Sequence, residues 1–314
     1  MPRVRNFWRT MARVAAIDCG TNSIRLLIAD IEGSQFREIY RTMEIVRLGQ
    51  GVDKTGQFHP DAIERTLTAL RTFQGEISRR GASKIRFCAT SATRDATNRQ
   101  LFIEGVKEII GIEPEVISGE EEARLSFLGA TRELHLSGAP FLVVDIGGGS
   151  TEFVFGSESV EFAKSVNIGC VRMSERHFTS APPSNHEIES ATSDINKAIM
   201  EASTIVPITS ARTVIAVAGT ATTVAAAALD LGEYDRYSIH LSRISAAKTH
   251  SVSDMFLKMK RNEISSLGYM HPGRVDVIAA GSLVLDRIME ILGAEEFVAS
   301  ESDILDGMAW SLAN

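Results

Sequence analysis

One short pattern, Asp-x-Gly-x-x-Ser between two apolar segments, occurs twice in this 314-residue chain. The first copy is AAIDCGTNSIRLLI, which contains Asp18, and the second is LVVDIGGGSTEFVF, which contains Asp145. Each copy predicts a strand, a polar turn and a second strand, and the two aspartates lie 145 − 18 = 127 residues apart. A repeated supersecondary unit constrains the fold because each copy must be packed into a core of its own. The sequence therefore predicts two related domains.

Strands and helices are predicted to alternate around both copies, because apolar residues recur there with periods of 2 or 3.6. Further strands are predicted at 38–48, 84–90, 113–118 and 214–219, and helices at 61–80, 99–110, from 118 onward, at 275–293 with a break near Gly281, and from 302 to the end. This order predicts an α/β fold. We expect a first domain at residues 1–134, with 1–12 disordered, and a second domain at 135–300.

Composition excludes several other classes of protein. No apolar run approaches the roughly 20 residues that cross a bilayer, and the basic start lacks the features of a signal peptide. Cys19, Cys88 and Cys170 form no CxxC pair, and the seven histidines form no zinc motif. The net charge of −7 argues against broad nucleic-acid binding. We therefore expect a cytoplasmic protein that binds neither membrane nor nucleic acid.

The residues of the two turns suit the binding of phosphate. Glycines let backbone N–H groups approach an anion closely, and hydroxyl or amide side chains add donors. The candidate phosphate-binding residues of the turns are Gly20, Thr21, Asn22, Ser23, Gly147, Gly148, Gly149, Ser150 and Thr151. Asp18 and Asp145 would lie beside the anion, which is favourable only if a cation such as Mg²⁺ offsets the repulsion. The alternative is a pair of ordinary glycine-rich turns.

Two predicted helix starts add candidate residues. Gly219 and Thr220 lie between a strand and an Ala-rich helix, where a helix N-terminus can bind an anion; the alternative is tight packing of helix on strand. In SGEEEARL, Ser118 and Glu121 have the spacing of a capping box, whereas Glu122 lies about 100° further around the helix. A carboxylate there can activate water, although acidic residues at helix starts are also common.

Five motifs in this order, DCGTNSIRLLI, SGEEEARLSF, DIGGGSTEFVFG, NIGCVRMSE and RVDVIAAG, resemble the exopolyphosphatase / guanosine pentaphosphate phosphohydrolase family of the actin–hexokinase superfamily. The resemblance runs from about residue 14 to the end. It implies two actin-like (ribonuclease H-like) domains around a phosphate-binding cleft, and a C-terminal helix, residues 301–314, that returns to the first domain. DILDG at 303–307 departs from the family's usual GLREG, which puts in doubt any substrate contact from that arginine.

The resemblance also implies roles for individual residues. It makes Glu122 the catalytic base and Arg94 a phosphate-binding arginine of the catalytic site. Mg²⁺ would be held by Asp145 and Glu152, with Asp18 as a further ligand. The alternatives are a surface salt bridge between Arg94 and Asp95, and an exposed strand glutamate at Glu152.

The implied function is Mg²⁺-dependent hydrolysis of the terminal phosphoanhydride of inorganic polyphosphate, which releases orthophosphate. Guanosine pentaphosphate would be a second substrate, and we expect a homodimer. One rival hypothesis is a kinase of the same superfamily that uses ATP. Another is a non-catalytic sensor that binds an alarmone or polyphosphate and does not need Glu122.

Overall fold

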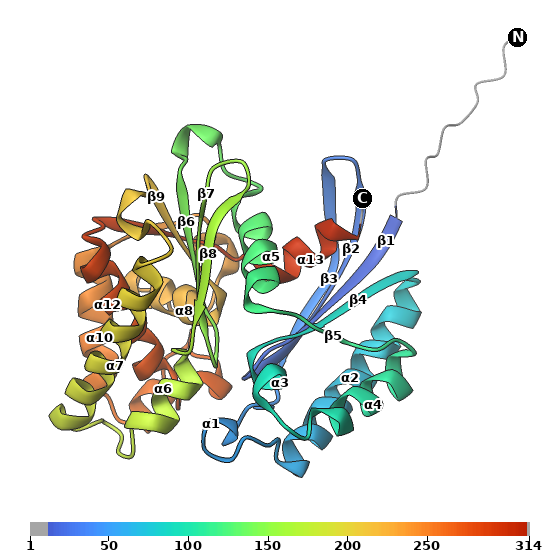
Figure 1. The fold of residues 1–314 in the computed structure, drawn as a ribbon, viewed down its shortest axis with the longest axis horizontal. Coiled ribbons are helices and arrows are strands. Elements are labelled where there is room, and N and C mark those ends of the chain that lie inside the picture. Colours follow the sequence, from blue (N-terminus) through green and yellow to red (C-terminus); the bar gives the residue numbers. More distant parts are fainter. Residues whose placement is uncertain (1–11, 313–314) are drawn as a thin grey trace, which may run out of the picture.

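The structure is a computed structural model that describes residues 12–312 of the chain. It has two lobes, each built on one β-sheet, and the lobes lie side by side (Figure 1). The disorder expected for residues 1–12 falls outside the described residues except at Ala12, which begins the first strand. Within the described part of the chain, no helix has the length and apolar character that crossing a membrane requires.

The first lobe contains a five-stranded sheet. Its strands are β1 (Ala12–Cys19), β2 (Ser23–Glu32), β3 (Gln35–Ile45), β4 (Lys84–Ala89) and β5 (Glu115–Val116), and its helices are α1 (Val52–Thr55), α2 (Pro60–Arg80), α3 (Ser91–Asp95) and α4 (Arg99–Ile110). The strand order is β3-β2-β1-β4-β5. β1 is antiparallel to β2 and parallel to β4, so the first turn lies at the end of a central, buried strand.

The second lobe repeats this arrangement. Its strands are β6 (Phe141–Ile146), β7 (Thr151–Gly156), β8 (Val160–Val166), β9 (Thr213–Val217), β10 (Arg243–Ser245) and β11 (Glu296–Ala299), and its α-helices are α6 (Cys170–His177), α7 (Asn185–Ser203), α8 (Ala218–Ala228), α9 (Arg236–Ile239), α10 (Ala246–Lys258), α11 (Arg261–Ser265) and α12 (Ile278–Leu292). The order is β10-β11-β9-β6-β7-β8. β6 is antiparallel to β7 and parallel to β9, as β1 is to β2 and β4. The predicted α/β fold of two actin-like domains is confirmed.

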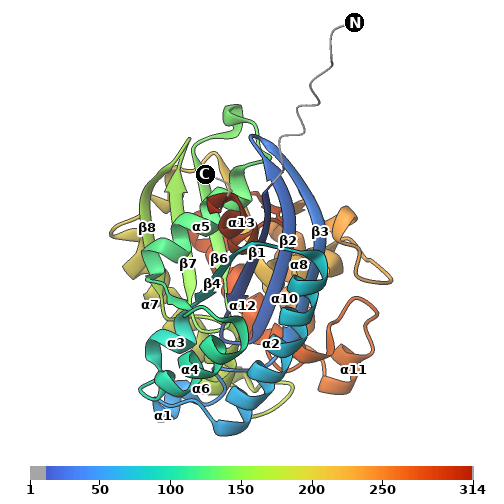
Figure 2. The same cartoon turned by 90° about the vertical axis from the view of Figure 1, so that its right-hand side faces the viewer.

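Two helices fill the space between the sheets, α5 (Gly119–Thr131) and α13 (Ile304–Ser311), and they lie side by side in both views (Figures 1 and 2). Two glycines allow their backbones to touch. A Cβ on Gly129 would lie 1.8 Å from the Asp303 carbonyl oxygen, and one on Gly307 would lie 2.0 Å from that of Leu125. α13 also packs its apolar residues against β1 and β2. The end of the chain therefore contacts the first lobe.

Three predicted elements differ from the structure. The third strand ends at Ile45 rather than continuing to residue 48, because Arg47 adopts a positive φ of 52° in a turn. The strand predicted at 113–118 is reduced to the short β5. α12 is continuous through Gly281, where no break occurs; a Cβ there would lie 2.7 Å from the Thr220 hydroxyl. Gly281 therefore permits close packing on α8 and does not interrupt its own helix.

Candidate active site

The two repeated turns have the same local geometry. In the first, the Gly20 N–H donates to the Ser23 carbonyl at 2.9 Å; in the second, the Gly147 N–H donates to the Ser150 carbonyl at 3.0 Å. Each turn follows a buried central strand, and each aspartate is almost entirely inaccessible to solvent. The sequence repeat is therefore a structural repeat down to single hydrogen bonds.

The turns face each other across a cleft between the lobes. A Cβ on Gly148 would lie 2.9 Å from Thr21 Cβ, and one on Gly149 would lie 2.8 Å from Thr21 Oγ1. The cleft holds a cavity of about 100 Å³. The predicted site residues that line this cavity are Asp18, Gly20, Thr21, Asn22, Ser23, Glu122, Asp145, Gly147, Gly148, Gly149, Ser150, Gly219 and Thr220. Most of the candidate residues therefore meet at one place.

Thr151 and Gly219 differ from their predicted settings. Thr151 lies in β7, and its hydroxyl donates to the Ile168 carbonyl, so it secures the segment before α6 rather than facing the cleft. α8 begins at Ala218, which places Gly219 and Thr220 inside its first turn rather than before it. The structure therefore places Thr151 outside the lining of the cavity, whereas Gly219 and Thr220 belong to that lining.

Glu122 lies at the cavity wall and is held by Arg94. Arg94 Nη1 donates to Glu122 Oε2 at 2.7 Å and to the Ile117 carbonyl at 3.0 Å. Burial raises the pKa of the Glu122 carboxyl above its ordinary value, although the charge of Arg94 opposes this effect. Arg94, predicted to bind phosphate, contacts Glu122 instead of lining the cavity, and Asp95, its alternative partner, pairs with Arg172. A buried carboxylate of raised pKa suits a base that accepts a proton from water.

Glu121 has a different setting from its neighbour. The Ser118 hydroxyl accepts from the Glu121 N–H at 3.2 Å, as the cap requires. The Glu121 carboxylate, however, accepts from Arg86 at 3.0 Å and from Arg124 at 2.7 Å instead of closing the capping box. These arginines lower the pKa of Glu121 to about 2. The reciprocal half of the predicted capping box is therefore wrong, because two guanidinium groups compete for the same oxygens.

Three buried carboxylates, those of Asp18, Asp145 and Glu152, lack full compensation. Among residues 12–312, Asp18 Oδ1 and Glu152 Oε2 find no hydrogen-bond partner, while Asp145 accepts from the Ser126 hydroxyl. Burial raises the pKa of each of the three carboxyls, that of Asp145 to about 7. Glu152 is buried in β7 and accepts from Ser165 at 2.6 Å, so it is not an exposed strand residue.

These oxygen atoms fit Mg²⁺. In residues 12–312, no three acidic, histidine or cysteine side chains lie close enough together to enclose an ion by themselves. Mg²⁺ keeps several waters and takes one or two carboxylates together with substrate phosphates, so two buried carboxylates are enough as protein ligands. Asp145 and Glu152 would hold the ion, with Asp18 facing it from the first turn. A bound cation would also relieve the burial of these charges.

We expect Asp145→Asn to stabilise the metal-free protein more at pH 8 than at pH 5. Because folding raises the pKa of Asp145 from near 4 to about 7, its contribution to stability is present at low pH and is lost as the pH rises through 7. Each kcal/mol recovered should raise the melting temperature by about 2–4 °C. Thermal melts in chelator at both pH values measure this effect.

Asp30→Asn is the matched control for that experiment. Asp30 is also buried, but Arg13 and Arg37 lower its pKa to about 2. Its stabilising contribution is therefore present at pH 8, and removing it should lower the melting temperature. A lower melting temperature for Asp145→Asn at pH 8 would contradict the assignment of an uncompensated charge.

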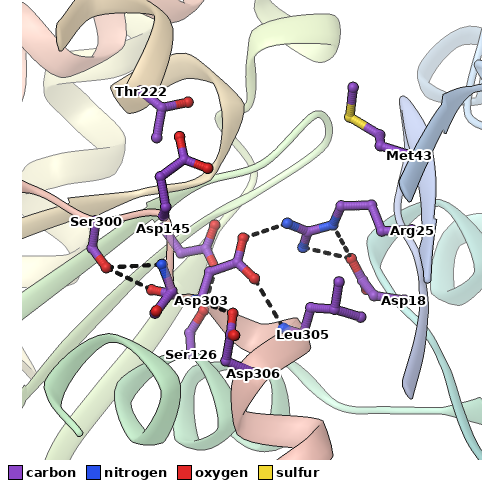
Figure 3. Close-up of polar contacts among 12 residues, drawn as sticks. Asp18, Arg25, Met43, Ser126, Asp145, Thr222, Ser300, Asp303, Leu305 and Asp306 are labelled. Carbon is purple, nitrogen blue, oxygen red and sulfur yellow. Dashed lines mark hydrogen bonds and ion pairs between the residues drawn. The ribbon is translucent and has the colours of Figure 1, made fainter. Parts of the chain in front are cut away.

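Arg25 is a site residue that the sequence analysis missed. It lies opposite Asp18 on the neighbouring strand and donates to Asp18 Oδ2 from Nε at 3.0 Å and from Nη2 at 2.7 Å. Its third nitrogen, Nη1, donates to Asp303 at the start of α13 (Figure 3). An arginine in an otherwise apolar strand was the available signal, since such a charge is buried only when it is paired.

Arg274 is a second missed residue. Its guanidinium lines the cavity and donates to the Thr223 hydroxyl at 3.1 Å, and among the described residues no carboxylate pairs with it. A Cβ on Gly219 would lie 2.5 Å from Arg274 Cζ, so Gly219 makes room for this group. An arginine without an acidic partner in a cleft is well placed to bind an oxyanion.

Residues 27–314 match the sequence pattern of the Ppx/GppA phosphatase family. The chain belongs to this family. It is 45% identical to exopolyphosphatase 2 of Mycobacterium tuberculosis over 96% of this chain and 99% of that protein. The crystal structure of an exopolyphosphatase-like protein superposes with a TM-score of 0.93, at 44% identity, over 96% of this chain and 98% of that one. The PPX-GPPA enzyme of Aquifex aeolicus superposes with a TM-score of 0.80, at 30% identity, over 96% and 99%.

These similarities confirm that the chain is an enzyme of the Ppx/GppA phosphatase family, as the five sequence motifs indicated. They extend over both lobes, so the cleft between the lobes belongs to the shared fold.

Proposed function

We propose that this Ppx/GppA-family protein is a cytoplasmic exopolyphosphatase that hydrolyses the terminal phosphoanhydride of inorganic polyphosphate and releases orthophosphate. The observation that carries the proposal is the meeting of the two turns beside Glu122 and the buried carboxylates of Asp18 and Asp145. The name of the mycobacterial relative, exopolyphosphatase 2, supports the same substrate. The expected homodimer stays a prediction.

The residues suggest a division of tasks in the reaction. Backbone N–H groups of the two turns bind the terminal phosphate, because both turns line the cavity and glycines at 148 and 149 let the second turn pack closely against Thr21 of the first. Glu122, oriented by Arg94, positions a water molecule for in-line attack and accepts its proton. Asp145 and Glu152 would hold Mg²⁺, which would supply positive charge that offsets the charge of the phosphates. Phosphoryl transfer depends mainly on such positioning and electrostatic stabilisation.

The remaining length of a polyphosphate chain has a route out of the small cavity. A second cavity of about 510 Å³ adjoins it and shares Arg25, Met43, Gly219 and Arg274 with the first. Two of these shared residues are arginines, which suit phosphate oxygens. Guanosine pentaphosphate, as a second substrate, would present its terminal phosphate to the same turns.

The rival kinase hypothesis receives less support from the structure. Superfamily kinases place their adenosine loop at the position of Gly281, but here the space around Gly281 is filled. A Cβ on Gly281 would lie 2.7 Å from Thr220 Oγ1 and 3.0 Å from Cys170 Cβ. Helix packing therefore occupies the space directly beside Gly281. The sensor hypothesis does not account for the buried pair of Glu122 and Arg94.

Comparing phosphate release from long-chain polyphosphate, guanosine pentaphosphate and ATP tests the proposal. We expect release from polyphosphate in the presence of Mg²⁺, none in excess chelator, and recovery when Mg²⁺ is restored, because the phosphates would otherwise meet several uncompensated carboxylates. Zinc should restore little activity, since the ligands are all oxygens. If ATP were the one substrate of the three that released phosphate, the kinase hypothesis would be favoured. If no substrate released phosphate, the sensor hypothesis would be favoured.

A further inference from the structure

Helix α6 of the second lobe lies next to α1 and α3 of the first lobe (Figures 1 and 2). Its backbone secures the second turn: the Val171 and Arg172 N–H groups donate to the Gly148 carbonyl at 2.9 and 3.0 Å. Its side chains at positions 172, 175 and 176, which share one helix face, reach residues of the first lobe. The first residues of α6 therefore bind the second turn through their backbone, and the side chains of α6 bind the first lobe.

Arg172 is the residue that makes both connections. Its Nε donates to the Gly149 carbonyl at 2.6 Å, its Nη2 donates to Asp95 Oδ2 at 2.5 Å, and its Nη1 pairs with Asp53. The Arg172 side chain is only 11% exposed. All three nitrogens of one guanidinium therefore bind three separate segments: the second turn, α3 and α1.

The segment that Arg172 holds through Asp95 needs an external anchor. α3 has only five residues, and within the described part of the chain no side chain caps its N-terminus. It nevertheless contributes Ser91 to the cavity wall, and it carries Arg94, the partner of Glu122, directly before Asp95. A Cβ on Gly149 would lie 2.7 Å from Ser91 Oγ, so α3 and the second turn are in contact across the cleft.

We propose that Arg172 is a positioning residue for phosphoanhydride hydrolysis: through Asp95 it fixes α3, with Ser91 and Arg94, against the second phosphate-binding turn. The proposal rests on the proposed function. The rigid, forked guanidinium suits this task because it can bind two carboxylates and a carbonyl in one fixed geometry. Loss of the tie should misplace Glu122 relative to the bound phosphate, and displacements on the order of 1 Å reduce turnover strongly.

Arg176 provides a matched control, since it crosses the same interface without touching the site. It donates to Asp53 at 3.1 and 3.2 Å and to Asp194 at 2.6 Å, and contacts neither Gly149 nor α3. Arg176→Gln therefore weakens the contact between the lobes but leaves the tie from Arg172 to Asp95 in place. If the two arginines contributed only to the general contact between the lobes, Arg172→Gln and Arg176→Gln would lower kcat by similar factors.

The test compares the unchanged protein with Asp95→Asn, Arg172→Gln, the double variant and Arg176→Gln, by kcat, KM and melting temperature on polyphosphate with Mg²⁺. Asp95 is 40% exposed, so the isosteric Asn should fold. We expect Asp95→Asn to lower kcat about 10-fold with little change in KM. Arg172→Gln should lower it further, and the double variant should match Arg172→Gln, because the two residues act through one contact. Arg176→Gln should retain most of kcat.

Three outcomes would overturn the proposal while leaving the proposed function intact: an unchanged kcat in Asp95→Asn, an equal loss in Arg176→Gln, or losses that multiply in the double variant. A loss that follows the melting temperature alone would likewise assign these residues to stability only. If the unchanged protein releases no phosphate, the proposed function itself fails and takes this inference with it.

Discussion

Replacing Glu122 with Gln should lower kcat by a factor on the order of 10²–10⁴, the usual loss for a positioned general base. The amide keeps the size of the side chain and can still contact Arg94, but it cannot accept a proton from water. Binding of polyphosphate should persist, because the turns that hold the phosphate are unchanged. Steady-state kinetics, together with equilibrium dialysis of polyphosphate against the variant, measure the two effects separately.

Glu121→Gln is the matched control, one residue away in the same helix turn. Its carboxylate is occupied by Arg86 and Arg124, so replacement should cost about 1 kcal/mol of stability or less and leave kcat near its original value. Loss of turnover in Glu121→Gln with full turnover in Glu122→Gln would show that the base has been assigned to the wrong glutamate.

This contrast marks the limit of what the sequence could predict. The spacing from Ser118 correctly separated Glu121 from Glu122, because helical geometry is local and fixes the angle between neighbours. It could not predict that Arg86, from strand β4, would bind the Glu121 carboxylate and so prevent it from closing the capping box. That outcome depends on which segments the tertiary fold brings together.

The same distinction applies to the rest of the site. The two turns were predictable because glycine, hydroxyl residues and flanking strands encode them within a few positions. Thr151 continued the sequence pattern, but strand alternation and a hydrogen bond to Ile168 direct its hydroxyl away from the cleft. Arg25 and Arg172 were not identified because their partners, Asp303 and Asp95, are 278 and 77 residues away in sequence.

Asp303 lies in the segment 303–307, where the sequence departs from the family pattern. The segment DILDG replaces the usual GLREG, so its arginine is missing. In this chain Asp303 caps α13, its Oδ1 accepting from the Leu305 N–H at 2.9 Å, and its other oxygen pairs with Arg25 from β2. The segment that lacks the family's arginine therefore contributes Asp303 to an ion pair with Arg25. Arg25 also pairs with Asp18, so it connects α13 to the first turn (Figure 3).

Gly148→Val should abolish phosphate binding and lower kcat/KM by on the order of 10²-fold or more, because it separates the two turns. A Cβ alone at this position would lie 2.9 Å from Thr21 Cβ and 3.3 Å from the Asn22 nitrogen, and valine adds two further methyl groups. The displaced turns could no longer contact one anion together. Isothermal titration with polyphosphate and Mg²⁺ measures the binding, and small-angle scattering measures whether ligand still makes the protein more compact.

Gly75→Val controls for the addition of a branched side chain at a position away from the cleft, in α2 of the first lobe. A Cβ on Gly75 would meet no atom within 4 Å, and valine has a helix propensity at least as high as that of glycine, so helix stability, binding and compaction should all remain. Because a ligand shifts a conformational equilibrium only through contacts that differ between the two states, the loss of compaction in Gly148→Val should accompany the loss of binding. If Gly148→Val binds polyphosphate as tightly as Gly75→Val does, the second turn contributes no direct contact, and the clamp formed by two turns is wrong.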